Sequence, residues 1–189
     1  RDIRDHIDDV RVGEIRDHDT AEMAFRAAMT GHQVYSTLHT NSAIGAIPRL
    51  LDLGVLPDIM AGNIIGVIAQ RLLRRLCSRC KKSVAADTTT VQLLRHNKDT
   101  PAPMVYQAIG CGYCHGTGYK GRMAIMEILK MDADLDELVA RRATGREMRK
   151  LAEEKGFHSL AEDGVRRVLS GETSLDEISR VVDLTDRIQ

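Results

Sequence analysis

Short alternating apolar segments and helix-like apolar stripes follow one another at the start of the chain. Val10, Val12 and Ile15 alternate with polar residues, which predicts a β-strand. The next residues carry an apolar stripe typical of an α-helix, and Gly31 is expected to end this helix. Gln33–Leu38 is rich in residues that favour strands. The pattern predicts strand, helix, strand, the order typical of an α/β sheet.

Two more helices are predicted after this segment. One begins at Asn41 or Ser42 and runs towards Leu53. Pro48 lies inside it and predicts a kink or a late start, because proline has no backbone N–H to donate. The other covers roughly Pro57–Ile64.

The segment Gly66–Leu76 fits either a helix or a strand by its apolar pattern. We favour a strand from about Val67, because Arg122–Leu129 has the pattern of a partner strand. All four cysteines lie between these two segments, which predicts a small module inserted at the tip of a strand pair. Within that module, Ala85–Pro103 is expected to be a loop.

The C-terminal part changes to helical spacing throughout. Glycine-containing breaks separate four predicted helices, which we expect to form a small helical bundle. These helices are Leu135–Arg142, Gly145–Lys155, Ser159–Leu169 and Ser174–Val182.

Composition narrows the classes of function. Lys plus Arg and Asp plus Glu number 27 each, so the net charge is zero and bulk electrostatics do not indicate nucleic-acid binding. The aromatic content of 3% argues against a platform for base stacking. The apolar runs are too short to span a bilayer, which favours a cytosolic protein. Because the first residue is Arg1 and a strand follows almost at once, we expect a fragment of a larger protein.

Four cysteines form two C-x-x-C pairs, Cys77 with Cys80 and Cys111 with Cys114. Two such pairs supply the four thiolates of a closed tetrahedral site, which Zn²⁺ favours in a structural role. An iron–sulfur cluster takes the same ligands, and redox pairs or unrelated thiols are further alternatives. His115 is the one plausible substitute ligand.

A glutamate and a histidine end the first two predicted strands. Carboxyl ends of neighbouring strands meet at one edge of an α/β sheet, where ligands bind. Glu14 has the position of a Walker B carboxylate, which organises Mg²⁺ or the attacking water beside a γ-phosphate. His39 is placed to sense that phosphate, with Thr37 as a hydroxyl donor and Arg16 as a partner for phosphate or a nearby aspartate. A solvated Glu and a structural His are the alternatives for each residue alone.

The chain contains no G-x-x-x-x-G-K-[ST] sequence. That loop supplies the backbone N–H groups and the lysine that hold the β- and γ-phosphates of a nucleotide. We therefore expect that this chain does not hydrolyse ATP alone. A zinc-stabilised protein-interaction module without ATPase activity is the alternative function.

Six motifs in order make the chain resemble the C-terminal half of the secretion ATPase superfamily, which powers type II secretion and type IV pilus assembly. They are VGEIRD (12–17), TGHQVYSTLHTN (30–41), RLLDLGV (49–55), AQRLLRRLCSRCK (69–81), GCGYCHGTGYKGR (110–122) and LAEDGVRRVLSGETSLDEISRVV (160–182). The family strand is generally apolar before VGE and usually preceded by Pro-Asp, whereas this chain has Ile7-Asp8-Asp9 and Arg11.

The resemblance implies an α/β fold with a partial RecA-like ATPase core that lacks the P-loop half. It implies Glu14 as the Walker B glutamate and His39 as the histidine of the His box, with His32 as a second member. Together with the residues considered above, this places Gly13, Arg16, His32 and Thr37 near the nucleotide phosphates, with ATP and Mg²⁺ as the expected cofactors. The tetracysteine branch of the family implies structural Zn²⁺ on the four cysteines.

The resemblance also implies a homo-hexameric ring on the cytoplasmic face of the inner membrane. Its partners would be an inner-membrane platform protein and other components of the secretion or pilus machine, with no nucleic acid. We expect residues 1–76 and 119–132 to form the RecA-like core, residues 77–118 the zinc subdomain and residues 133–189 the C-terminal helical subdomain.

Overall fold

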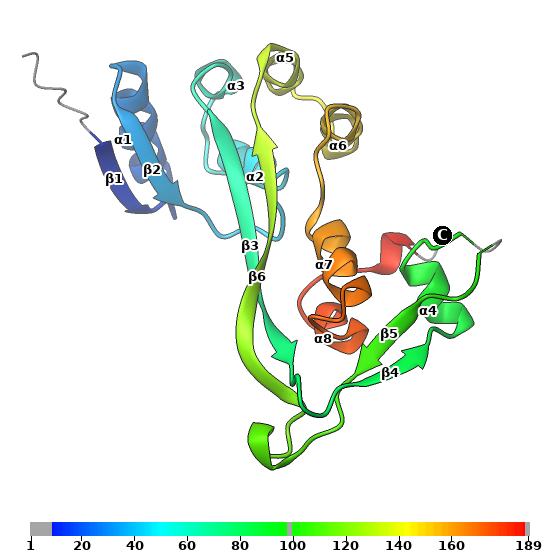
Figure 1. Cartoon of the computed structure of the whole chain (residues 1–189). Coiled ribbons are helices and arrows are strands. Elements are labelled where there is room, and N and C mark those ends of the chain that lie inside the picture. The colour runs from blue at the N-terminus through cyan, green and yellow to red at the C-terminus, as the bar shows by residue number, and fades with distance from the viewer. Residues whose placement is uncertain (1–8, 98–99, 188–189) are drawn as a thin grey trace, which may run out of the picture. The chain divides into compact units, whose positions relative to one another are not determined.

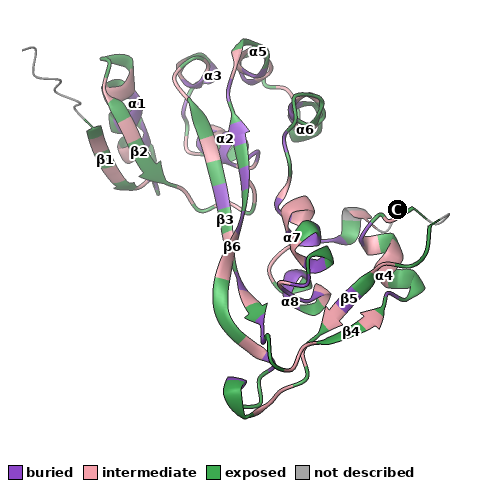
Figure 2. Ribbon diagram, viewed as in Figure 1, coloured by how far each residue is buried: buried purple, intermediate pink, exposed green. Residues whose placement is uncertain are grey.

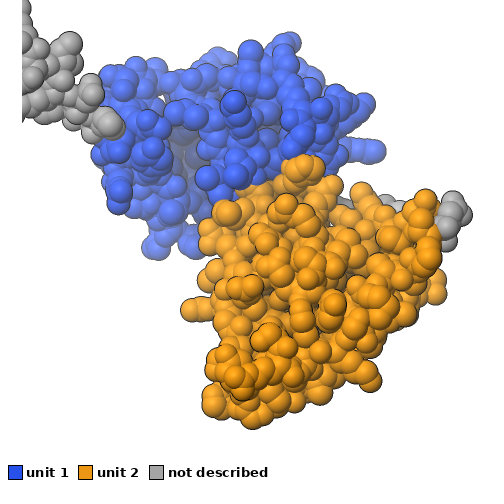
Figure 3. All heavy atoms as spheres, in the orientation of Figure 1, with its two compact units in different colours: residues 1–69, 128–157 blue, residues 70–127, 158–189 orange. Residues whose placement is uncertain are grey.

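The computed structural model describes residues 9–97 and 100–187 (Figure 1). It divides the chain into two compact units (Figure 3). The first unit contains the described residues up to Ala69 together with Ile128–Phe157. The second contains Gln70–Glu127 together with the described residues from His158 onward. Ile7 and Asp8, which depart from the family pattern, lie outside the described residues.

The first unit opens with strand β1 (Asp9–Glu14), helix α1 (His18–Met29) and strand β2 (Gln33–Thr37). The two strands pair in parallel, with Asp9 opposite Gln33, which confirms the predicted strand, helix, strand order. The register shifts between Arg11 and Glu14, which gives the end of β1 an irregular pairing. This irregularity re-aims the last side chain of the strand.

Local chemistry explains both ends of α1. Asp17 precedes the helix, and its carboxylate accepts a hydrogen bond from the Thr20 N–H at 2.8 Å. Such a cap satisfies a backbone donor that has no partner inside the helix. After the helix, Gly31 adopts a φ of 94°, a conformation that favours glycine. The helix buries its apolar side through Ala21, Ala24 and Phe25.

Helix α2 covers Ala46–Asp52, so the expected start at Asn41 or Ser42 is wrong and the late start suggested by Pro48 is correct. Pro48 lies in the first turn, where its missing N–H removes no helical hydrogen bond.

Helix α3 covers Pro57–Met60 and ends before the expected Ile64. Gly62 has a φ of 77°, which a continuing α-helix does not accommodate.

Strand β3 (Gly66–Leu76) pairs with strand β6 (Tyr119–Lys130). This pairing confirms that the ambiguous segment is a strand and that its partner lies beyond the cysteines. Between them, β4 (Lys82–Ala85) and β5 (Met104–Gln107) form an antiparallel pair.

The expectation that Ala85–Pro103 is a loop is wrong, because it contains helix α4 (Thr88–Leu93). The carboxylate of Asp87 accepts a hydrogen bond from the Thr90 N–H at 2.7 Å and caps this helix. Asp87 is a helix-capping signal in the sequence. The three threonines that follow it favour strands and turns over helices, so the sequence alone does not indicate a helix there.

The four predicted C-terminal helices are all present. Helices α5 (Ala133–Ala140) and α6 (Gly145–Glu154) belong to the first unit, and α7 (Leu160–Leu169) and α8 (Leu175–Ser179) to the second. Buried positions recur along α7 and α8 (Figure 2). Val168 and Ile178 are both fully buried. Two short 3₁₀ helices cover Gly112–Cys114 and Thr185–Arg187. Among the described residues, no helix has the length and apolarity needed to cross a membrane.

Candidate functional site

The ends of β1 and β2 form the first candidate site. Glu14 is the last residue of β1 and pairs in register with Thr37, the last residue of β2. The Ile15 N–H continues the pairing by donating to the Thr37 carbonyl at 2.9 Å. Because the strands are parallel, both carboxyl ends lie at the same edge, as the sequence predicted.

Glu14 and His39 are in direct contact. His39 Nε2 lies 2.6 Å from Glu14 Oε1. The Glu14 side chain is 20% exposed, whereas the His39 side chain is 87% exposed. Among the residues that the structure describes, no aligned hydrogen-bond donor serves the buried Oε1 atom, and its close contact with His39 is an ion pair only when the imidazole is protonated.

Arg16 contacts the other oxygen of the same carboxylate. Its Nε donates to Glu14 Oε2 at 2.7 Å, and Nη2 lies 2.5 Å from that atom. The hydrogen bond from Arg16 holds the pKa of Glu14 below its ordinary value, with a further contribution from the charge of Arg16. The Glu14 carboxylate is therefore ionised near neutral pH. Of the two partners considered for Arg16, phosphate and a nearby aspartate, the structure shows neither, because the side chain contacts Glu14 instead.

Gly13 and Thr37 complete the strand ends. The Thr37 hydroxyl donates to the Gly13 carbonyl at 3.1 Å, and the Ser36 hydroxyl approaches the same carbonyl at 3.3 Å. A Cβ at Gly13 would have no heavy atom within 4 Å, so the backbone on that side is open. The Ser36 contact escaped the sequence analysis, since serine in a strand carries no distinctive signal.

His32 lies at the opposite end of β2 from His39. Its Nδ1 is 3.2 Å from the Ala27 carbonyl and 3.1 Å from the Thr30 hydroxyl, at the C-terminus of α1. Strands rise by about 3.3 Å per residue, so the length of β2 separates His32 from Glu14. The structure therefore does not bring this candidate to the edge where the others meet.

The four cysteines form the second candidate site, in the second unit. Their sulfur atoms lie within 4.8 Å of one another, and Cys77 and Cys114 are buried. Neighbouring sulfurs are 3.9 Å apart for Cys77 and Cys111, 3.8 Å for Cys80 and Cys114, and 3.7 Å for Cys111 and Cys114. All four thiols are free.

These separations fit a tetrahedral metal centre. With a Zn–S distance of about 2.3 Å, tetrahedral geometry places the sulfurs roughly 3.8 Å apart. A disulfide requires about 2.05 Å between the sulfurs, far less than the observed distances. His115 is not part of the cluster formed by the described residues. Among the described residues, the cluster therefore consists of the four cysteines.

Backbone N–H groups point at the sulfurs. Cys114 Sγ accepts from the N–H of Cys111 and of Gly118 at 3.2 Å each, and Cys80 Sγ accepts from the Gly110 N–H at 3.4 Å. Gly118 has a φ of 76°, and a Cβ there would lie 2.6 Å from the Ala108 Cβ. Glycine is therefore required at this position, a role that the glycine-rich spacing around the second cysteine pair could have indicated.

The pKa values of Cys80 and Cys114 are shifted in opposite directions. Burial raises the pKa of the Cys80 thiol to about 12. Burial also opposes ionisation of Cys114, but the backbone N–H groups of Cys111 and Gly118 lower its pKa to about 6. The polypeptide thus stabilises a thiolate at Cys114, whereas a bound cation would be needed to stabilise a thiolate at Cys80.

Similarity to known proteins extends over most of the chain. The family model described as "Type II/IV secretion system protein" matches residues 2–180. The type IV pilus assembly ATPase TfpB of Acinetobacter baylyi is 45% identical over 97% of this chain, and the type II secretion system protein E of Pseudomonas aeruginosa is 45% identical over 95%. The chain spans 32% and 35% of the lengths of these relatives.

Solved structures support the fold. The X-ray structure of the Yersinia pseudotuberculosis ATPase DotB matches 94% of this chain with a TM-score of 0.62 at 20% identity, and the chain covers 37% of it. The Legionella pneumophila ATPase DotB matches 92% of this chain with a TM-score of 0.60. These matches confirm the predicted α/β fold class with a RecA-like core.

Proposed function

Because the chain belongs to the type II/IV secretion system protein family, we propose that it contributes the water-activating and phosphate-sensing half of an ATP-hydrolysing site. The whole protein would be the motor of a type II secretion or type IV pilus assembly system. The named relatives are such secretion proteins and pilus assembly ATPases. The chain itself carries no phosphate-holding G-x-x-x-x-G-K-[ST] loop, so we propose that it is inactive alone.

The observation that carries this proposal is the placement of Glu14. Its carboxylate lies at the carboxyl end of β1, ionised through its contact with Arg16 and with one buried oxygen lacking an aligned donor among the described residues. An ionised carboxylate at this position orients a water molecule for in-line attack on a phosphate and receives a proton from it. Mg²⁺ bound with ATP would neutralise charge on the phosphates.

His39 and Arg16 have complementary roles in the proposal. Both are largely exposed and both contact Glu14. When a nucleotide binds, their N–H groups can turn from Glu14 to phosphate oxygens. Thr37 and Gly13 shape the strand ends beside them. We retain His32 as a candidate of the His box with an indirect role, because it lies at the other end of β2.

For the second site, we propose that Cys77, Cys80, Cys111 and Cys114 bind one structural Zn²⁺. The sulfur spacing and the burial of two ligands support a closed site rather than a catalytic one. We also propose the domain boundaries expected from the sequence, with the zinc subdomain at residues 77–118 between the two parts of the RecA-like core at 1–76 and 119–132.

We propose a homo-hexamer at the cytoplasmic face of the inner membrane, which works on a membrane platform protein and does not bind nucleic acid. Neighbouring subunits and the residues upstream of this chain would supply the phosphate-holding side of each ATP site.

Glu14→Gln in the full-length protein tests the proposal directly. Single-turnover hydrolysis should fall by about 100-fold or more, the range for loss of a general base, while binding of a fluorescent ATP analogue stays at the wild-type level. Glu22→Gln is the matched control, since Glu22 is an exposed residue of α1 that pairs with Arg26. Hydrolysis by Glu14→Gln at the wild-type rate would overturn the assignment.

A further inference from the structure

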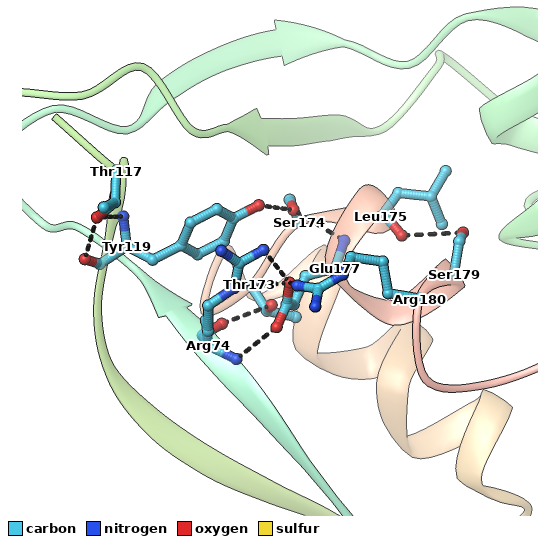
Figure 4. Close-up of polar contacts among 9 residues, drawn as sticks. All are labelled: Arg74, Thr117, Tyr119, Thr173, Ser174, Leu175, Glu177, Ser179 and Arg180. Atoms are coloured by element: carbon cyan, nitrogen blue, oxygen red, sulfur yellow. Dashed lines mark hydrogen bonds and ion pairs between the residues drawn. The ribbon is translucent and has the colours of Figure 1, made fainter.

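The segment from Gly171 to Arg180, here called the C-terminal clamp, contacts the strands on either side of the cysteine cluster (Figure 4). It contains the loop after α7 and helix α8. Thr173, Ser174 and Glu177 of the clamp are polar yet 0–3% exposed. Buried polar groups are costly unless they are fully hydrogen-bonded, so such a concentration identifies a specific network.

Glu177 is the centre of this network. Its Oε1 accepts the Arg74 backbone N–H at 3.0 Å, and its Oε2 accepts Arg74 Nε at 2.9 Å and Arg180 Nη1 at 2.8 Å. The carboxylate thus binds both the backbone and the side chain of one β3 residue. This arrangement fixes the position of the strand and not only of a flexible side chain.

Further contacts extend along β3 to the first cysteine pair. The Thr173 hydroxyl donates to the Arg74 carbonyl at 2.9 Å, and the Leu76 N–H donates to the Glu172 carbonyl at 2.9 Å. Leu76 directly precedes Cys77. The clamp therefore positions the backbone up to the first metal-ligand candidate.

The clamp also contacts the other side of the cysteine cluster. Lys81, which follows Cys80, donates from Nζ to the Gly171 carbonyl at 2.7 Å. The Tyr119 hydroxyl lies 2.6 Å from the Ser174 hydroxyl, and the Arg74 guanidinium lies 4.2 Å from the centre of the Tyr119 ring. Tyr119 follows Gly118, whose N–H donates to Cys114 Sγ. Both cysteine pairs are thus connected to the same short segment.

We propose that the C-terminal clamp, with Glu177 as its positioning residue, sets the geometry of the tetracysteine metal site, so that metal binding and docking of α8 stabilise each other. The inference rests on the proposed metal site. A metal site requires the sulfurs to lie within a few tenths of an ångström of tetrahedral positions. The clamp is hydrogen-bonded to the residues adjacent to Cys77 and Cys80, so it can hold these sulfurs in place. By linkage, whatever the clamp contributes to metal affinity, the metal contributes equally to clamp docking.

Glu177→Gln tests the first half of this coupling. The change keeps the shape of the side chain but removes its charge, so the strong contacts to Arg74 and Arg180 weaken. Zinc affinity of the 189-residue chain, measured by competition with a chromogenic chelator, should fall by about 10-fold, the lower end of the effect of outer-shell residues. Glu154→Gln, an exposed residue of α6 in the first unit, is the control of equal charge change and should bind zinc as the wild type does.

Hydrogen exchange tests the reciprocal half. In the wild-type chain, removal of zinc should accelerate exchange of the α8 amides, including the fully buried Ile178. In Glu177→Gln these amides should already exchange quickly with zinc bound. Wild-type zinc affinity in Glu177→Gln, or α8 exchange that does not respond to zinc, would overturn the proposal.

A milder variant covers the case in which Glu177→Gln does not fold. Tyr119→Phe removes only the hydroxyl that contacts Ser174 and keeps the ring beside Arg74. It should lower zinc affinity by about 3-fold, in line with the loss of one hydrogen bond. A wild-type chain that binds no zinc at all would instead disprove the metal site itself. This result is distinct from equal affinities in wild type and variants.

Discussion

His39 Nε2 lies 2.6 Å from Glu14 Oε1. A histidine just beyond the end of β2 therefore contacts the carboxylate of the residue that ends β1. The pairing of Glu14 with Thr37 brings them together, because it sets both strand ends at one level. In this arrangement, the orientation of the His39 ring determines whether Glu14 Oε1 contacts His39 or is accessible to water. A phosphate that attracts His39 would free this oxygen for water.

His39→Ala should reduce hydrolysis in the full-length protein. Loss of a donor that stabilises developing negative charge typically costs about 100-fold in kcat, and we expect that magnitude. His158→Ala is the control, because His158 is 79% exposed and contacts Glu162 in the second unit. A kcat within twofold of wild type in His39→Ala would rule out phosphate sensing by this residue.

Arg16→Ala should raise the pKa of Glu14 towards the ordinary glutamate value of about 4.3. The reason is the loss of the hydrogen bond and the positive charge that favour the ionised form. Carbon-13 NMR of the Glu14 carboxyl during a pH titration measures the change. Arg26→Ala removes a comparable exposed arginine that pairs with Glu22, and should leave the Glu14 titration unchanged. An unchanged titration in Arg16→Ala would show that the contact does not persist in solution.

Cys111→Ser should abolish zinc binding and destabilise the second unit by about 4 kcal/mol or more, as expected when a structural metal is lost. Elemental analysis and urea unfolding measure the two effects. His115→Ala should retain one zinc per chain, because His115 lies outside the described cluster. Loss of zinc from His115→Ala would show that His115 is a ligand in place of one of the cysteines.

Acid should weaken the C-terminal clamp. Burial opposes the charge of Glu177, but hydrogen bonds and charge from Arg74 outweigh it and hold its pKa below the ordinary value. A group with a lowered folded pKa stabilises the fold above its unfolded pKa of about 4.3, and this stability is lost as the pH falls through the folded pKa. The urea midpoint should therefore decrease below about pH 4.3 in the wild type, measured on metal-free protein.

Glu177→Gln provides the comparison for this pH dependence. Because glutamine does not titrate, its urea midpoint should decrease less over the same pH range. Parallel pH profiles for the two proteins would assign the acid sensitivity to other carboxylates.

Periodicity and motifs along the chain were enough to predict the strand, helix, strand unit, the pairing of Gly66–Leu76 with a later strand, and the grouping of the cysteines. These features depend on local backbone preference and on residue spacing, which the sequence contains directly. Helix α4 was missed because a single capping aspartate outweighs weak propensities there. The early end of α3 was missed because the conformation of Gly62 depends on its surroundings.

Contacts between distant residues required the tertiary structure. Residue types alone placed Glu14, His39 and the four cysteines as candidates, but they did not show that Arg16 binds Glu14 or that His32 lies at the far end of its strand. They also did not show that Glu177 binds Arg74 beside the cysteine cluster. Charged side chains can pair with many partners of opposite charge, and only the tertiary position of α8 beside Arg74 selects this pair and buries the Glu177 carboxylate.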